Sequence, residues 1–198
     1  MKPSINQLAT LKRDLTEERR IRRALIDSSV RLSSMFNLPQ LLQTIMNTAA
    51  DLLEAETASL LMYDPTTHEL TFEVAVGETE KQIKSLRMSG DAGIAGWVLK
   101  HQKPTIVDKA QNDPHFSDVI DRALGFVTRS VLAVPLTVRD RMIGVIEVIN
   151  KKGKTGFNER DLEVAGAFAA QAAVAIDNAH LYEKLADTVV QSRLSYRL

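Results

Sequence analysis

The chain has 198 residues, of which 44% are hydrophobic and 25% are charged, and its 25 basic residues balance its 25 acidic ones. This composition is typical of one globular domain with additional helices, and it excludes a disordered or fibrous chain. The net charge of zero favours neither a nucleic acid nor an anionic membrane as a partner. Because there is no cysteine, the sequence excludes disulfides, cysteine zinc sites and thiolate catalysis.

The beginning of the chain lacks the continuous apolar stretch of a signal peptide. Nowhere do roughly 18 apolar residues follow one another, so no segment is predicted to span a bilayer as a helix. We therefore expect a soluble, cytoplasmic protein that binds neither membranes nor nucleic acids.

Residues 1–37 predict a helix with a narrow apolar stripe, since leucines recur there at spacings of three and four. The stripe begins with Leu8, Leu11 and Leu15 and continues with Ile21 and Leu25. The basic residues of this segment lie beside acidic ones and have no aromatic residues between them. This pattern favours the flank of a coiled coil over a nucleic-acid-binding surface.

The segment after Pro39 predicts a second helix, whose broad apolar face indicates packing on a core. Two strand-like runs follow at 58–63 and 70–76, and the proline-containing turn between them predicts a hairpin. Residues 90–104 predict a glycine-rich loop and a short helix that Pro104 ends.

The next segment predicts a short strand at 105–107, a loop, and a helix at 116–124 that Gly125 ends. Trp97, the one tryptophan, lies on the short helix before this segment. Its position indicates either a core residue or the wall of a pocket, and the residues alone leave both open.

Two long strands are predicted at 129–138 and 141–151, joined as an antiparallel hairpin by two residues. Asn158 then caps a long helix, whose small and apolar first half indicates packing on the sheet. After residue 178 this helix keeps only a stripe, which contains Leu181, Leu185 and Val189. Together the elements predict an α+β domain, with helices on one face of an antiparallel sheet and loops and short helices on the other.

The sequence has no motif of a phosphate-binding loop, a hydrolase or a metalloprotease, and its four histidines lie far apart. Glu147 interrupts an apolar strand, so it faces either water or the base of a pocket. A hydrolase that uses Asp121, Glu147 or His115 would lack a nucleophile–base pair. We therefore expect neither a catalytic residue nor a metal site.

Several motifs occur in a fixed order: ASLLMYD from residue 58, GDAGIAGWV from 90, IVDKAQNDPHF from 106 and IGVIEVINK from 143. In this order they resemble a GAF domain, the small-molecule sensing module of phosphodiesterases, phytochromes and bacterial regulators. The resemblance implies a central six-stranded antiparallel sheet with helices on one face and a ligand pocket on the other, flanked by long N- and C-terminal helices. It divides the chain into an N-terminal signalling helix at 1–37, a GAF domain at 38–178 and a helical extension at 179–198.

The family's signature, NK followed at a distance by FxxxDE, is matched by Asn150, Lys151, Phe157 and Asp161, with Leu162 in place of the final glutamate. The resemblance implies a structural ion pair between Lys151 and Asp161. The ligand pocket that it implies consists of Ser59, Ile94, Ala95, Trp97, Phe116, Asp121, Thr128 and Glu147.

Four residues depart from the members of the family that bind cyclic nucleotides. These departures are Ala75, Val76, Ser117 and Leu124, which stand where those members hold the base. They remove stacking and hydrogen bonds to a base. The identity of the ligand therefore stays open, and a molecule other than a cyclic nucleotide is an alternative.

The resemblance implies a non-catalytic sensory module of signal transduction, which binds a small molecule and acts through a dimeric helical bundle. Two alternatives stay open: a structural dimerisation module with a vestigial pocket, and a cyclic-nucleotide-binding domain. The expected ligand is a cyclic nucleotide or another small metabolite. The absence of cysteine excludes a covalent bilin and the reduction of free methionine sulfoxide.

The expected partners are a second copy of the chain and an output domain or signalling protein. A helix that exposes a narrow apolar stripe is marginally stable alone, and a second copy of the same helix would cover the stripe. The predicted dimer interface consists of Leu8, Leu11, Leu15, Leu181, Leu185 and Val189.

Overall fold

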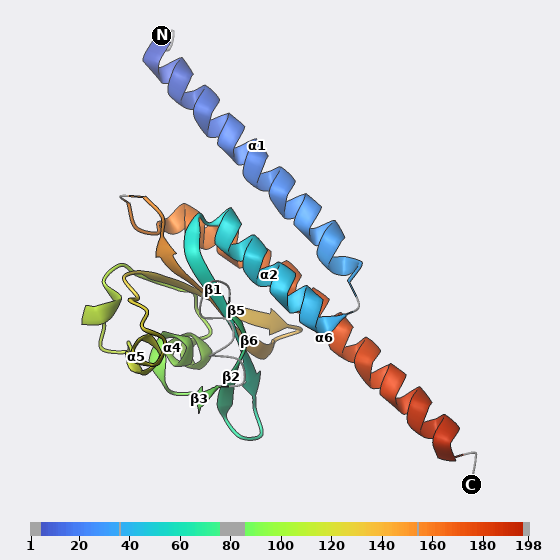
Figure 1. Ribbon diagram of the computed structural model, residues 1–198. Helices are drawn as coiled ribbons and strands as arrows, with labels where there is room; N and C mark the ends of the chain where they lie inside the picture. The colour runs from blue at the N-terminus through green and yellow to red at the C-terminus, as the bar shows by residue number, and fades with distance from the viewer. Residues whose placement is uncertain (1–4, 36, 76–85, 154, 196–198) are drawn as a thin grey trace.

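The computed structural model describes residues 5–35, 37–75, 86–153 and 155–195 (Figure 1). Its helices are α1 (Ile5–Ser33), α2 (Leu38–Leu52), α4 (Gly93–His101), α5 (Val119–Leu124) and α6 (Glu159–Ser195), with a 3-10 turn, η1 (Ala110–Asn112). Its strands are β1 (Ala55–Asp64), β2 (Glu69–Ala75), β3 (Arg87–Ser89), β4 (Thr105–Val107), β5 (Val131–Val138) and β6 (Arg141–Lys151).

The six strands form one sheet in the order β3-β2-β1-β6-β5-β4, and every neighbouring pair is antiparallel. The two hairpins predicted from the sequence are β1–β2 and β5–β6. Arg139 and Asp140 join β5 to β6 with positive φ at both residues, as a two-residue turn between right-twisted strands requires. The predicted α+β class and six-stranded antiparallel sheet are thereby confirmed.

The sheet separates two cores, because successive side chains of a strand point to opposite faces. On β6, Ile146 and Val148 join a core with α2 and α6, whereas Val145 joins a core with α4. The same alternation places Leu60 and Leu61 of β1 in different cores. Helices α2 and α6 therefore cover one face of the sheet, and α4, α5 and the loops around them cover the other (Figure 1).

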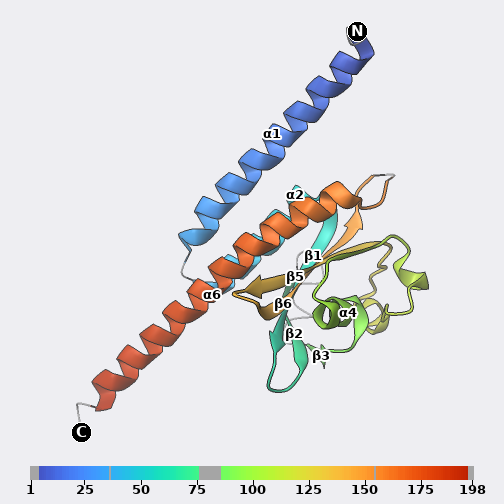
Figure 2. The ribbon, with the colours of Figure 1, turned by 180° about the vertical axis from the view of Figure 1, so that it is seen from behind.

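The long helix α6 begins at a cap formed by Asn158, whose side-chain oxygen accepts hydrogen bonds from the Arg160 and Asp161 amides at 2.9 and 3.1 Å. Its first half lies on the sheet through Phe168 and a series of alanines. Beyond His180, the described side chains are exposed, and the helix projects past the domain (Figure 2).

Helix α1 lies along α2 and α6 with its second half and extends away from the domain with its first half (Figure 2). Leu32 is only 2% exposed, and Ile21 and Leu25 pack against the same core. Leu11 and Leu15 are 56% and 46% exposed. The predicted apolar stripe of α1 therefore has two parts. The chain's own domain covers the part with Ile21 and Leu25, and the part with Leu11 and Leu15 stays exposed.

Two helix boundaries differ from the prediction. Helix α5 begins at Val119 instead of residue 116, because the Asp113 carboxylate accepts the His115 amide at 2.8 Å and holds this segment in a turn. Helix α4 ends at His101, three residues before Pro104, because its C-cap Gln102 adopts the left-handed conformation. Among the helices of the described residues, none combines the length and the hydropathy needed to cross a membrane.

Candidate functional site

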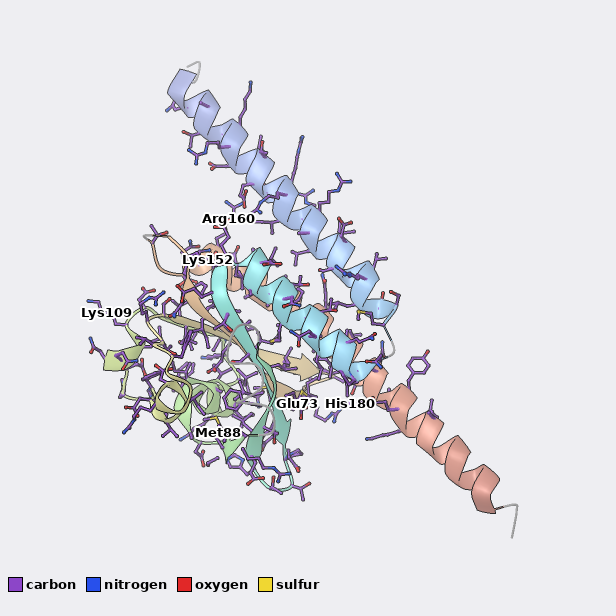
Figure 3. The ribbon with its side chains drawn as sticks, in the orientation of Figure 1. Glu73, Met88, Lys109, Lys152, Arg160 and His180 are labelled. Atoms are coloured by element: carbon purple, nitrogen blue, oxygen red, sulfur yellow. The ribbon has the colours of Figure 1, made fainter. Side chains whose placement is uncertain are left out.

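A cavity of about 310 Å³ lies between the sheet and the segment that contains α4 and α5, on the face opposite α2 and α6. Met88 of β3, labelled in Figure 3, contributes to its wall. Most wall residues are apolar, and they include three phenylalanines, Phe72, Phe116 and Phe126. An apolar cavity with a few convergent polar groups is the usual form of a small-molecule site.

Seven of the eight residues predicted for the pocket line this one cavity. They are Ser59, Ile94, Ala95, Phe116, Asp121, Thr128 and Glu147. They come from β1, α4, the α5 region, the segment before β5, and β6. Residues up to 88 positions apart in the sequence are brought together here because β1 and β6 are neighbours in the sheet.

Trp97 does not line the cavity, contrary to the prediction. Helix α4 turns Ile94, Ala95 and Val98 inward, and the intervening Trp97 lies on another side of the helix. Its ring stacks on His101 with the centroids 4.3 Å apart and meets His115 edge-on at 6.3 Å. Trp97 is therefore half-buried in a small aromatic cluster with two histidines.

Asp121 is buried, and its carboxylate accepts hydrogen bonds from other residues of the chain. Oδ1 accepts a hydrogen bond from the Thr128 hydroxyl at 2.7 Å, and Oδ2 accepts the Thr128 amide at 2.8 Å. Gln111 donates its side-chain amide to the same Oδ2 at 3.1 Å. These bonds fix α5 to the segment before β5, so Asp121 and Thr128 build the cavity wall.

Glu147 lies in the middle of β6, opposite Ser59 of β1 and Ala133 of β5. Its half-buried side chain lines the cavity, which decides between the two orientations that the sequence left open. Burial raises the pKa of this carboxyl to about 7, and the nearby Ser59 hydroxyl and Ala95 backbone amide counteract only part of the rise. Ala95 belongs to the first turn of α4, whose amides lack partners within the helix.

Ser59 is 3% exposed and lines the cavity beside Glu147. Within the described residues its hydroxyl oxygen has no hydrogen-bond partner of normal geometry. Buried hydroxyls are usually bonded, so this atom is a polar group available to a molecule in the cavity.

Lys151 and Asp161 form the ion pair that the resemblance implied, at 2.9 Å and with both side chains largely buried. The ammonium group also donates to the Leu53 carbonyl at 2.9 Å and lies 5.8 Å from the centre of the Phe157 ring. Neither charged residue lines the cavity. The pair joins β6 to the start of α6.

The sequence did not predict the role of Asn150, the residue before Lys151. Asn150 is buried with a φ of 60°, and its side chain donates to the Glu56 carboxylate and the Val127 carbonyl, each at 2.9 Å. Its side-chain oxygen accepts the amides of Arg129 and Ser130. The family signature named this residue, but only its side-chain hydrogen bonds reveal that it connects β6 with β1 and with the segment before β5.

Burial raises the pKa of Glu56, but the hydrogen bonds from Asn150 and Arg129 outweigh burial and lower the pKa below its usual value.

His115, considered above as a residue of a hydrolase, forms a hydrogen bond with the Asp113 carboxylate and lies outside the cavity wall. The described residues contain no group of three acidic or histidine side chains placed to hold a metal ion.

The family model that matches the chain is that of the GAF domain, over residues 37–176. The probable 3′,5′-cyclic phosphodiesterase pde-5 of Caenorhabditis elegans is 29% identical over 150 residues, covering 71% of this chain and 20% of that protein. The cone cGMP-specific 3′,5′-cyclic phosphodiesterase subunit alpha′ of Mus musculus is 36% identical over 90 residues, covering 46% of this chain and 10% of that protein. The chain thus spans a fifth or less of these relatives.

The fold is shared with the solved GAF domain of a phosphoenolpyruvate-protein phosphotransferase from Coxiella burnetii. The TM-score is 0.74 at 20% sequence identity, over 83% of this chain and 96% of that one. At this identity the likeness describes the fold and leaves the ligand open.

Proposed function

Because the chain belongs to the GAF domain family, we propose that it is a non-catalytic sensory module that binds a small molecule in the cavity and acts through its terminal helices. The observation that carries the proposal is the cavity of about 310 Å³, whose apolar wall holds a few buried polar groups. In this proposal residues 38–178 are the sensor, and residues 1–37 and 179–198 are the helices that transmit the signal.

In this proposal the module transmits its signal as a homodimer, in which the projecting parts of α1 and α6 pair with those of a second copy. Support comes from Leu11 and Leu15 on α1 and from Leu181 and Leu185 on α6, all at least 46% exposed. A helix that exposes such a stripe gains stability from a partner helix, and a symmetric dimer supplies one. The side chains of Leu8 and Val189 lie outside the described residues.

A route from the cavity to the helices runs through β6. Glu147 faces the cavity, and its neighbours Ile146 and Val148 face the core under α6, so a shift of the strand changes both. At the start of the same strand, Arg141 donates to the Asp177 carboxylate of α6 at 2.7 Å. The route is a contiguous set of contacts through which a ligand could bias the position of α6.

A cyclic nucleotide is one candidate ligand, supported by the relation to proteins named as cyclic phosphodiesterases. A structural dimerisation module with a vestigial pocket is the second candidate function, supported by Ser117. This small residue lines the cavity where nucleotide-binding members carry an aromatic side chain. The two candidates differ in whether any small molecule stabilises the fold.

The experiment is a thermal-shift screen of the full chain against a metabolite and cyclic-nucleotide library, together with native mass spectrometry for a molecule that co-purifies. We expect at least one molecule to raise the melting temperature by a few degrees. Ile120→Trp, which enlarges a wall residue, should abolish the shift, and Val174→Trp on the exposed side of α6 should not. The absence of any stabilising or co-purifying molecule would favour the structural alternative.

A further inference from the structure

The described wall of the cavity contains three ionisable side chains, Arg87, Asp121 and Glu147, and two of them are already engaged. Arg87 is 66% exposed and donates to the Glu69 carboxylate at 3.3 Å. Asp121 is bonded by Thr128 and Gln111. Neither wall carboxyl of the described residues is paired with a cation, but Asp121 has neutral donors in place, whereas Glu147 has only the nearby Ser59 hydroxyl and Ala95 amide.

Within the described residues, no element packed around Glu147 supplies it with a balancing charge. β1 presents the Ser59 hydroxyl, β5 presents Ala133, α4 presents the Ala95 amide and α5 presents another acid, Asp121. An amide of the first turn of α4 supplies a partial positive charge and no more. A carboxylate in such apolar surroundings is costly unless a full positive charge and further hydrogen bonds accompany it.

An anionic ligand is disfavoured by the same arrangement. Asp121 would repel it, as would Glu147 once it has lost its proton, and the Ala95 amide already points to the Glu147 carboxyl. A ligand with a protonated nitrogen would instead supply the missing charge and donate to the carboxylate. The phenylalanines of the wall favour an apolar or aromatic body and attract a cation over their faces.

We propose that the cavity selects a small ligand whose apolar or aromatic body carries a protonated nitrogen group, and that Glu147 and Ser59 bind this group. The proposal rests on the sensory function proposed above and names the chemical class of its ligand. Ser59 contributes a buried hydroxyl next to the carboxyl, without a hydrogen bond of normal geometry in the described residues, so two acceptors converge on one donor group.

The proposal makes binding depend on pH. Since burial raises the pKa of Glu147 to about 7, the carboxyl must lose its proton before a cation can bind below this pH. The apparent affinity for a permanently charged probe should then fall about tenfold between pH 8 and pH 6. The affinity for a neutral probe should change much less.

The test uses three planar probes of nearly equal size: benzamidine as the cation, benzamide as the neutral donor and benzoate as the anion. Each is titrated into the full chain up to about 10 mM and followed by NMR chemical shifts, a range that covers weak fragment binding. We expect benzamidine to bind at least about tenfold more tightly than benzamide at pH 8, and benzoate not to bind.

Variants assign the effect to the two residues. Glu147→Gln should reduce benzamidine to the level of benzamide and remove the pH dependence, and Ser59→Ala should weaken benzamidine several-fold. Glu163→Gln, an exposed glutamate on α6, is the matched control and should leave all three affinities unchanged. The pH dependence of the unmodified chain is a readout that does not depend on the folding of any variant.

Benzoate binding as tightly as benzamidine would overturn the proposal, and so would the absence of benzamidine binding or its persistence in Glu147→Gln. The proposed sensory function would survive these results if another metabolite, cyclic GMP included, stabilised the chain and Ile120→Trp abolished that effect. If neither the probes nor any library molecule bound, both proposals would fail.

Discussion

Thr128 donates both its hydroxyl and its backbone amide to the buried carboxylate of Asp121, at 2.7 and 2.8 Å. The two residues are seven positions apart, and their bonds close the chain between α5 and β5 into a compact loop. Because Gln111 donates to the same carboxylate at 3.1 Å, the wall of the cavity is held together by one acidic side chain.

Replacing this acid should therefore destabilise the fold. We expect Asp121→Ala to lower the free energy of unfolding by about 2–4 kcal/mol, because it leaves several buried donors unpaired. Thr128→Val, which removes one donor and keeps the shape, should lower it by about 1 kcal/mol. Urea denaturation measures both, and a loss below about 0.5 kcal/mol for Asp121→Ala would contradict the positioning role.

Glu147 should make the stability of the ligand-free chain depend on pH. Its pKa is about 7 in the folded chain and 4.5 ordinarily, so the folded state holds the proton more tightly. The stability that this proton provides is complete below about pH 4.5 and is lost as the pH rises through about 7. Glu147→Gln should therefore be more stable than the parent chain by about 2–3 kcal/mol at pH 8, and hardly different at pH 4.5.

Denaturant curves at the two pH values measure this difference, with Glu163→Gln as the control. An equal effect of Glu147→Gln at both values would mean that the carboxyl is not desolvated in the folded chain. A destabilised variant at pH 8 would mean that the charge of Glu147 is compensated by the protein itself.

The sheet and its hairpins could be predicted from the sequence because their signals are local. The alternation of strand residues and the two-residue link at Arg139 and Asp140 are visible without knowledge of the fold. Seven residues of the cavity wall were predicted by resemblance, since several motifs that carry the resemblance are segments that line it. Trp97 was misassigned because a motif fixes which helix a residue belongs to, and the packing of the helix decides which side faces the cavity.

Other features depend on contacts between distant segments. Nothing in the leucine stripe of α1 indicates that Leu32 is covered by the chain's own α2 and α6 while Leu11 stays exposed. The pairing of Asp121 with Thr128 and the left-handed conformation of Asn150 likewise depend on how loops return to the sheet. Such contacts have no periodic pattern, so neither hydrophobic periodicity nor a short motif could have revealed them.

Gly144 and Gly166 should respond in opposite directions to the same substitution. A Cβ at Gly144 would lie 2.3 Å from the Leu61 carbonyl oxygen on the neighbouring strand, whereas a Cβ at Gly166 would meet no atom within 4 Å. We expect Gly144→Ala to lower the free energy of unfolding by roughly 3 kcal/mol, since two central strands must move apart. Gly166→Ala should raise it by about 0.5–1 kcal/mol through helix propensity, and thermal unfolding of both variants measures the contrast.

Asn150 should be among the most sensitive residues of the fold. Its buried side chain makes four hydrogen bonds to two segments, β1 and the residues before β5, and its backbone has a φ of 60°. Asn150→Ala should lower the free energy of unfolding by about 3–5 kcal/mol, and Asn150→Gly by about 1 kcal/mol less, because glycine adopts this conformation without strain. Equal losses in urea denaturation would show that backbone conformation contributes nothing, and a loss below about 1 kcal/mol would contradict the hydrogen-bonding role.

The exposed leucines of the terminal helices should determine the oligomeric state. Leu11 and Leu15 are exposed on α1, and Leu181 and Leu185 are exposed on α6. The first half of α1 and the last half of α6 lie at opposite ends of the molecule (Figure 1). A bundle that buries these stripes between two copies needs on the order of 1,000 Å² of total contact area to be specific, and two long helices per chain supply enough surface.

Multi-angle light scattering of the full chain should therefore give twice the mass of one chain at micromolar concentration. The double variant Leu11→Asp with Leu15→Asp should give a monomer, because a charge in the stripe would be buried without a partner. Ala9→Asp introduces one carboxylate at an exposed position away from the stripe and should leave the dimer intact. A monomeric parent chain at about 50 µM, or a dimer that survives the double variant, would remove the terminal helices from the proposed mechanism.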